Sequence, residues 1–69
     1  MTKQQTTPKR LMRLPEVQRI TGLSKSSIYD RIKDKHFPKS VPLGGRSVAW
    51  VESEVNEWVE TQIASRGVI

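Results

Sequence analysis

The sequence predicts a mostly helical domain with a small β-hairpin, in the order helix-turn-helix, two-stranded wing and C-terminal helix. Three observations favour this winged helix-turn-helix class: a glycine between two short helical segments, a Gly-Gly turn between two strand-like runs, and a final amphipathic segment. The chain has 69 residues, which suffices for one domain with a modest core. We expect a flexible basic arm at residues 1–9, the folded domain at residues 10–66 and a short tail at residues 67–69.

The first two helices are predicted to meet at Gly22. Residues 14–20 favour a short helix, because Pro15 suits a first helical position, where its missing N–H is no loss. Gly22 can adopt the left-handed conformation that ends a helix, and Ser24 is a preferred N-cap for a second helix over about residues 25–34. In a helix-turn-helix, the second helix normally enters the major groove of DNA.

A hairpin is predicted directly after these helices. Two strand-like runs, residues 41–43 and 47–50, flank Gly44-Gly45-Arg46, and a Gly-Gly pair permits the positive φ angles of tight turns. Pro42 cannot donate to a sheet ladder, so its strand belongs at an edge. The hairpin is then a wing with Arg46 at its tip, able to reach a phosphate or a narrow minor groove. An ordinary surface turn with a solvated arginine is the alternative.

Residues 51–66 are predicted to form the last helix. Its stripe has helical spacing and consists of Val51, Val55, Trp58, Val59, Gln62 and Ile63. We expect the stripe to close the core against Leu14, Val17, Ile20, Leu23, Ile28, Ile32, Phe37 and Trp50. Trp58 could instead anchor a partner protein, but a tryptophan on such a stripe in so small a domain is more often core.

The charge is unevenly distributed along the chain. The net charge is +5, and residues 1–46 contain eleven of the twelve Lys and Arg residues but three of the seven acidic residues. The remaining four acids are glutamates of the last predicted helix. This pattern indicates one face for a polyanion such as nucleic acid and another face turned away from it. The alternative is a protein that is basic without having such a partner.

Several function classes find no support in the sequence. The chain has no cysteine, which excludes disulfides and thiolate metal sites and fits a reducing cytoplasm, where we expect it to act. His36 has no second histidine to complete a metal site, and we expect it in a solvated loop. There is no P-loop or nucleophile elbow, and the acids form no plausible shielded pair, so we expect neither an enzyme nor a cofactor. No apolar run approaches a membrane span, so we expect no membrane partner.

The second helix supplies most of the candidate DNA contacts. Ile28 and Ile32, at i and i+4, define its buried face, so side chains roughly opposite meet the groove. The candidate DNA-binding residues are Lys25, Ser26, Ser27, Tyr29, Arg31 and Lys33 from this helix and Arg46 from the wing.

Roles within this set follow from side-chain chemistry. Ser26 and Ser27 can bond phosphate together with the N–H groups of the helix N-terminus, and Lys25 can neutralise a phosphate. The fork of Arg31 matches O6 and N7 of guanine. Lys33 lies nearer the rim.

Six short segments occur in one order that is typical of a known family. They are residues 10–17 (RLMRLPEV), 21–24 (TGLS), 27–29 (SIY), 37–39 (FPK), 43–46 (LGGR) and 50–58 (WVESEVNEW). Together they resemble the AlpA family of small phage and prophage regulators, over about residues 10–64. The resemblance implies a winged helix-turn-helix related to excisionases and to the DNA-binding end of MerR regulators.

The resemblance also implies a function and one site role. It implies sequence-specific binding of double-stranded DNA by a regulator of a phage, prophage or integrated mobile element, acting on an integrase or excision gene or site. A recombination directionality factor that bends attachment-site DNA is the alternative. In MerR-like proteins the residue after the buried isoleucine touches the DNA backbone, and here that residue is Tyr29. Asp30 departs locally from the pattern: it could accept from cytosine N4 in the major groove, or it could face solvent and pair with Lys33 or with the neighbours of Asp34, and we favour solvent.

A function without DNA also stays open. A winged-helix module such as an antirepressor could bind another protein through the acidic last helix. The clustering of cations before Ser47 favours DNA, because a protein-interaction module has no need of it. With no second apolar stripe, we expect a monomer in solution. Side-by-side, cooperative binding at repeated sites is an option, because one module offers limited contact area.

Overall fold

The computed structural model describes residues 9–66, which form three helices and three short strands. In chain order they are β1 (Leu11–Met12), α1 (Leu14–Thr21), α2 (Lys25–Lys33), β2 (Val41–Gly44), β3 (Ser47–Val51) and α3 (Glu52–Ser65). The mostly helical, winged helix-turn-helix class predicted from the sequence is confirmed. Most of the predicted basic arm and the whole predicted tail lie outside the described residues.

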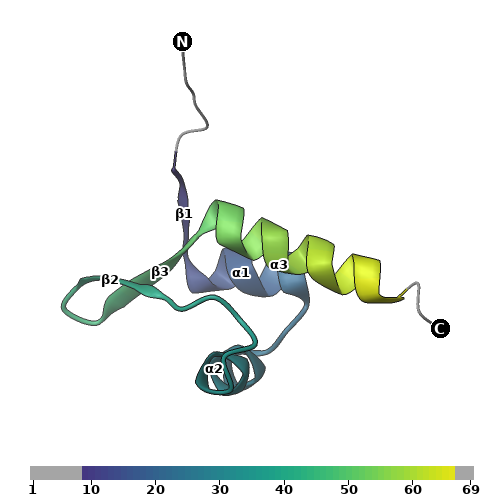
Figure 1. Cartoon of the computed structure of the whole chain (residues 1–69). Helices are drawn as coiled ribbons and strands as arrows, with labels where there is room; N and C mark the ends of the chain where they lie inside the picture. Colours follow the sequence, from purple (N-terminus) through teal and green to yellow (C-terminus); the bar gives the residue numbers. More distant parts are fainter. Residues whose placement is uncertain (1–8, 67–69) are drawn as a thin grey trace, which may run out of the picture.

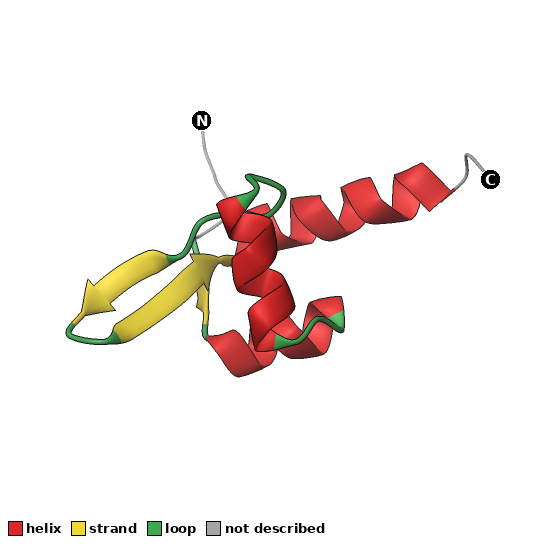
Figure 2. Ribbon diagram, turned by 90° about the horizontal axis from the view of Figure 1, so that it is seen from below, coloured by secondary structure: helices red, strands yellow, loops and turns green. Residues whose placement is uncertain are grey.

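The hairpin and the last helix project from opposite sides of the domain. The hairpin β2–β3 extends from one side of the body, and the C-terminal part of α3 extends from the other (Figure 1). The same arrangement is seen from below, with α2 between the hairpin and α3 (Figure 2). The hairpin therefore has the position of a wing beside α2.

The turn between α1 and α2 is built as the sequence predicts. Gly22 has a φ angle of 75°, and its N–H donates to the Gln18 carbonyl at 2.8 Å. Ser24 caps α2, because its side-chain oxygen accepts from the Ser27 N–H at 3.2 Å. Helix α1 continues one residue further than predicted, to Thr21, whose hydroxyl donates to the Val17 carbonyl at 2.8 Å.

The sheet contains one strand that the sequence did not reveal. The order is β1-β3-β2, and both pairings are antiparallel. The β2–β3 hairpin confirms the predicted wing, with Pro42 opposite Val48 and β2 at the sheet edge. Strand β1 adds to the other side of β3, with Leu11 opposite Val51 and Met12 opposite Trp50. A strand of two residues is too short to show the alternation by which strands are recognised.

The core forms where the sheet meets the first turns of the helices. Its buried apolar residues are Met12, Val17, Ile28, Phe37, Ala49, Trp50 and Val55. Trp50 is fully buried, and its indole N–H donates to the Pro38 carbonyl at 3.1 Å. Trp58 packs edge-on against Phe37 and donates to the His36 carbonyl at 2.7 Å, so it belongs to the core side of α3, as predicted.

The core prediction is wrong for three residues, which the structure leaves exposed. Ile20 is 39% exposed and Ile63 is 46% exposed, and Gln62 is exposed as well. On α1, Leu14 and Thr21 lie on the half-buried face of the helix, whereas Ile20 lies outside that face. The last turns of α3 extend beyond the body, so no other element within residues 9–66 covers Ile63 (Figure 2). The helix also begins at Glu52, because the preceding residue still pairs in the sheet.

Candidate nucleic-acid interface

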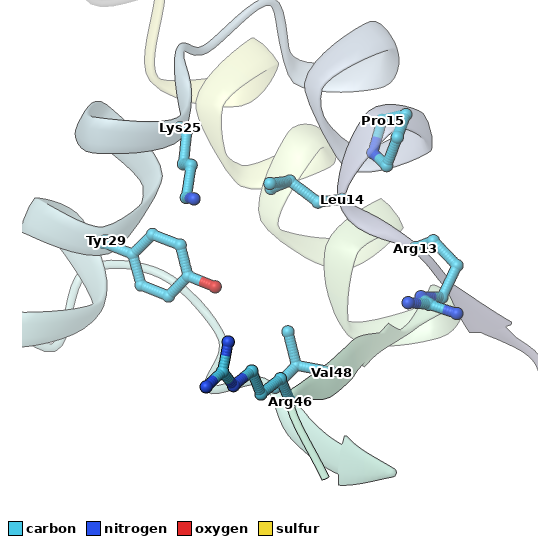
Figure 3. A pocket seen from close by; sticks show the side chains of 7 residues that line it. All are labelled: Arg13, Leu14, Pro15, Lys25, Tyr29, Arg46 and Val48. Carbon is cyan, nitrogen blue, oxygen red and sulfur yellow. The ribbon is translucent and has the colours of Figure 1, made fainter. Parts of the chain in front are cut away.

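An open hollow lies between the start of α2, the wing and the start of α1. We call it the cationic hollow; its volume is about 400 Å³, and it is lined by Arg13, Leu14, Pro15, Lys25, Tyr29, Arg46 and Val48. Three of the lining side chains are cations and none is acidic. Figure 3 shows the amino group of Lys25, the hydroxyl of Tyr29 and the guanidinium groups of Arg13 and Arg46 around it. Three of the seven predicted DNA-binding residues therefore meet at one place.

Helix geometry brings Lys25 and Tyr29 to the same side of α2. They are four residues apart, so their side chains lie one above the other on one flank of the helix. The Tyr29 ring packs edge-on against Trp50, with 6.1 Å between the ring centroids. Because Trp50 is fully buried and hydrogen-bonded, it holds the ring while the Tyr29 hydroxyl points to the cationic hollow (Figure 3).

Arg46 reaches the hollow from the tight turn of the wing. Gly44 and Gly45 have φ angles of 109° and 57°, which side-chain-bearing residues rarely adopt. These two glycines reverse the chain immediately before Arg46, whose side chain is exposed. The guanidinium of Arg46 thus lies opposite the Tyr29 hydroxyl without being buried (Figure 3).

Arg13 is a further lining residue that sequence reasoning missed. It is the N-cap of α1 and has an extended backbone, and its side chain makes no capping hydrogen bond. Its carbonyl accepts from Glu16 and Val17 at 3.0 and 3.1 Å, which ties its backbone to the first turn of α1. No local sequence pattern identifies Arg13 as a site residue, because Arg13 is brought near the wing by the pairing of β1 with β3.

The two candidate serines differ in their surroundings. Ser27 is half-buried, and its hydroxyl accepts from the Ser24 hydroxyl at 3.0 Å within the N-cap of α2. Ser26 is exposed, with its hydroxyl 3.4 Å from that of Ser24. The Ser26 hydroxyl is therefore the more accessible to a ligand at this helix end.

The remaining candidates on α2 do not join the cationic hollow. Arg31 is half-buried, and its guanidinium donates to the Ser27 carbonyl at 3.4 Å, on the flank opposite Lys25. Lys33 is exposed in the last turn of the helix. Asp30 is exposed, as expected, and forms no ion pair with Lys33 within residues 9–66.

A neighbouring hollow is lined by acids as well as cations. Arg10 lies 4.0 Å from Glu52, and Arg19 forms an ion pair and hydrogen bond with Glu16. All four residues line a second hollow that Arg13 also borders. Because the acids lie beside these arginines, the excess of positive charge lies in the cationic hollow.

The fold and this surface define a small winged helix-turn-helix protein whose wing and second helix present cations on one side. Residues 10–63 match the family described as Prophage CP4-57 regulatory protein (AlpA), and the chain belongs to this family. Its members are regulatory proteins, which confirms the expectation that the chain is not an enzyme.

Two relatives support the assignment. The chain is 48% identical over 60 residues to the uncharacterized protein ORF88 of Enterobacteria phage P4, a match that covers 87% of this chain and 68% of that protein. It is 41% identical over 56 residues to the DNA-binding transcriptional activator AlpA of Escherichia coli strain K12, with 72% of this chain and 80% of that protein covered. Between residues 9 and 66, no helix is both long and apolar enough to cross a membrane.

Proposed function

We propose that this protein binds double-stranded DNA and acts as a transcriptional activator for an integrated phage or related mobile element. The observation that carries the proposal is the excess of cations in the hollow between α2 and the wing, which no acidic side chain lines. The acids Glu54, Glu57 and Glu60 are exposed on α3 instead. A polyanion attracted to the first surface is repelled by the second, which favours one orientation on DNA. The Escherichia coli relative is described as a DNA-binding transcriptional activator, which supports the same function.

In the proposed complex, α2 lies in the major groove and the wing follows the adjacent backbone. Lys25, Tyr29 and Arg46 contact phosphates on the side of the cationic hollow. Ser26 bonds a phosphate at the helix N-terminus, and Lys33 contacts the backbone at the rim.

Base reading is proposed for Arg31. To reach a guanine, its guanidinium leaves the Ser27 carbonyl and forms two parallel hydrogen bonds with O6 and N7. The Ser27 hydroxyl takes part in phosphate binding only if it leaves its hydrogen bond with Ser24. These two residues therefore contribute after a local rearrangement.

The proposed target is an integrase or excision gene of the element, and the proposed place of action is the cytoplasm of the bacterial host. Gel retardation at two salt concentrations, with duplexes from the neighbouring integrase promoter and attachment site, tests this. We expect binding that weakens as salt rises, and a footprint on one of these duplexes. Equal affinity for these duplexes and for random DNA would contradict the target, and no binding at low salt would contradict the function.

Two alternatives predict different outcomes in the same assay. A recombination directionality factor would protect the attachment site and bend it, which circularly permuted fragments would detect as position-dependent mobility. An antirepressor would bind a regulator and not DNA. The exposed acids of α3 and the exposed Ile63 near its end favour a protein-docking surface there.

We also propose that the protein is a monomer in solution and that two copies bind side by side on DNA with repeated sites. Sedimentation of the protein with and without a two-site duplex tests this proposal.

A further inference from the structure

We propose that the cationic hollow binds a single phosphate of the DNA backbone, and that Arg13 is one of its ligands. This inference rests on the proposed function, since it requires a bound duplex. It adds a contact from the start of α1 to those expected from α2 and the wing. The site thereby links three separate parts of the chain through one anion.

The lining of the hollow fits a phosphate. Lys25 and Tyr29 approach from α2, Arg46 from the wing turn and Arg13 from the residue before α1 (Figure 3). A guanidinium matches two phosphate oxygens with two N–H donors, while an ammonium or a phenol hydroxyl supplies one donor at a time. Four donors from different directions therefore surround one hollow. The rest of its lining is apolar and consists of Leu14, Pro15 and Val48.

Arg13 differs from the neighbouring arginines in its partners. Arg19 pairs with Glu16, and Arg10 lies near Glu52, so an acid offsets the charge of each. Within residues 9–66, no acidic side chain lies within ion-pair distance of Arg13. Its charge is therefore available to a ligand, whereas the charges of the other two are partly offset.

The backbone of Arg13 is positioned before any ligand arrives. On one side, Met12 pairs with Trp50 in the sheet. On the other side, the Arg13 carbonyl accepts two N–H groups from the first turn of α1. A residue held on both sides loses less conformational freedom on binding, and this favours a specific contact over a diffuse attraction.

The phosphate is inferred to belong to a DNA strand and not to a free anion. The cations around the hollow are exposed, so water and salt screen their attraction for a single small ion. A duplex held by α2 and the wing places a phosphate there at a high effective concentration. Both sources share the same chemistry, and the experiment below includes an arm for each.

The central experiment compares Arg13→Ala with Arg19→Ala. Each variant removes one exposed arginine that borders the second hollow, so the loss of net charge is matched. The affinity for a short random-sequence duplex is measured at several salt concentrations, which requires no knowledge of the operator. We expect Arg13→Ala to weaken binding roughly tenfold and to reduce the slope of log affinity against log salt by about one unit. Arg19→Ala should weaken binding by no more than about twofold.

Two controls separate a phosphate contact from a structural role. The Arg13 carbonyl still accepts its two hydrogen bonds in the alanine variant, so the melting temperature should match that of the wild-type protein. Arg13→Lys keeps the charge and should retain most of the salt slope. If Arg13→Ala and Arg19→Ala lose affinity and slope equally, the inference is overturned while the proposed function stands.

The second arm titrates the DNA-free protein with inorganic phosphate and follows the side-chain N–H signals of Arg13 by NMR. We expect no saturation at millimolar phosphate. Saturable shifts there would overturn the assignment to a DNA phosphate in favour of a free anion. If the wild-type protein binds no duplex even at low salt, the proposed function fails and this inference fails with it.

Discussion

Substitution of Arg31 tests whether this residue of α2 reads a base or binds a phosphate. Its guanidinium donates to the Ser27 carbonyl at 3.4 Å, which is long for a hydrogen bond. Giving up such a bond costs at most about 1 kcal/mol, whereas a bidentate guanine contact contributes about 1–3 kcal/mol of discrimination. Arg31→Ala should therefore weaken binding to the true site by about 1–2 kcal/mol and weaken binding to random DNA much less.

Lys25→Ala is the matched comparison on the same helix. Lys25 is exposed and lines the cationic hollow on the flank opposite Arg31. A phosphate contact carries no sequence information, so its loss should weaken binding to both DNAs alike. The slope of log affinity against log salt should fall by about one unit on both duplexes.

The assay is fluorescence anisotropy with the footprinted site and a random duplex of equal length, at several salt concentrations. Melting temperatures of both variants establish that the fold is unchanged. An equal loss of affinity on the two duplexes with Arg31→Ala would refute the reasoning, and Arg31 would then be a phosphate clamp. Specificity would have to come from Ser26, Ser27, Tyr29 or the shape of the DNA.

Three further variants test the turn, the end of α2 and the wing. Gly22→Val should lower stability by about 1–3 kcal/mol in thermal unfolding, because a side chain at a φ angle of 75° strains the backbone although the surrounding space is open; unchanged stability would contradict this. Lys35, with a φ angle of 65°, is strained in the native protein, so Lys35→Gly should raise stability by about 0.5–1 kcal/mol, and a decrease would count against that strain. Arg46→Ala should weaken DNA binding by about 1–2 kcal/mol with an unchanged melting temperature; an unchanged dissociation constant would reduce the wing to a structural turn.

Local chemistry explains why much of the fold was predictable. Gly22 ends α1, Ser24 caps α2, and the Gly-Gly pair reverses the chain before Arg46. Each of these acts within a few residues, so the neighbouring sequence carries the signal. The place of Lys25 and Tyr29 on one flank follows from helix periodicity alone.

Other features depended on parts of the chain that are distant in sequence. Strand β1 exists because β3 offers a free edge, and this pairing is what brings Arg13 beside the wing. Ile20 and Ile63 have the right character for a core but stay exposed, because none of the described helices and strands covers their positions. Sequence periodicity shows which residues share a helix face, but it does not show how far the neighbouring elements of the fold extend along that face.

The sequence by itself determined the order of the three helices and the hairpin, the helix-turn-helix corner, the wing and the uneven charge, because all of these are properties of short segments or of composition. Only the tertiary structure decided which cations meet in one hollow and which are offset by an acid. Arg13, Arg10 and Arg19 look alike in the sequence, yet the last two lie beside glutamates and the first faces Lys25 and the wing. The physical reason is that ion pairing depends on distances of a few ångströms between side chains, which folding sets across separate elements.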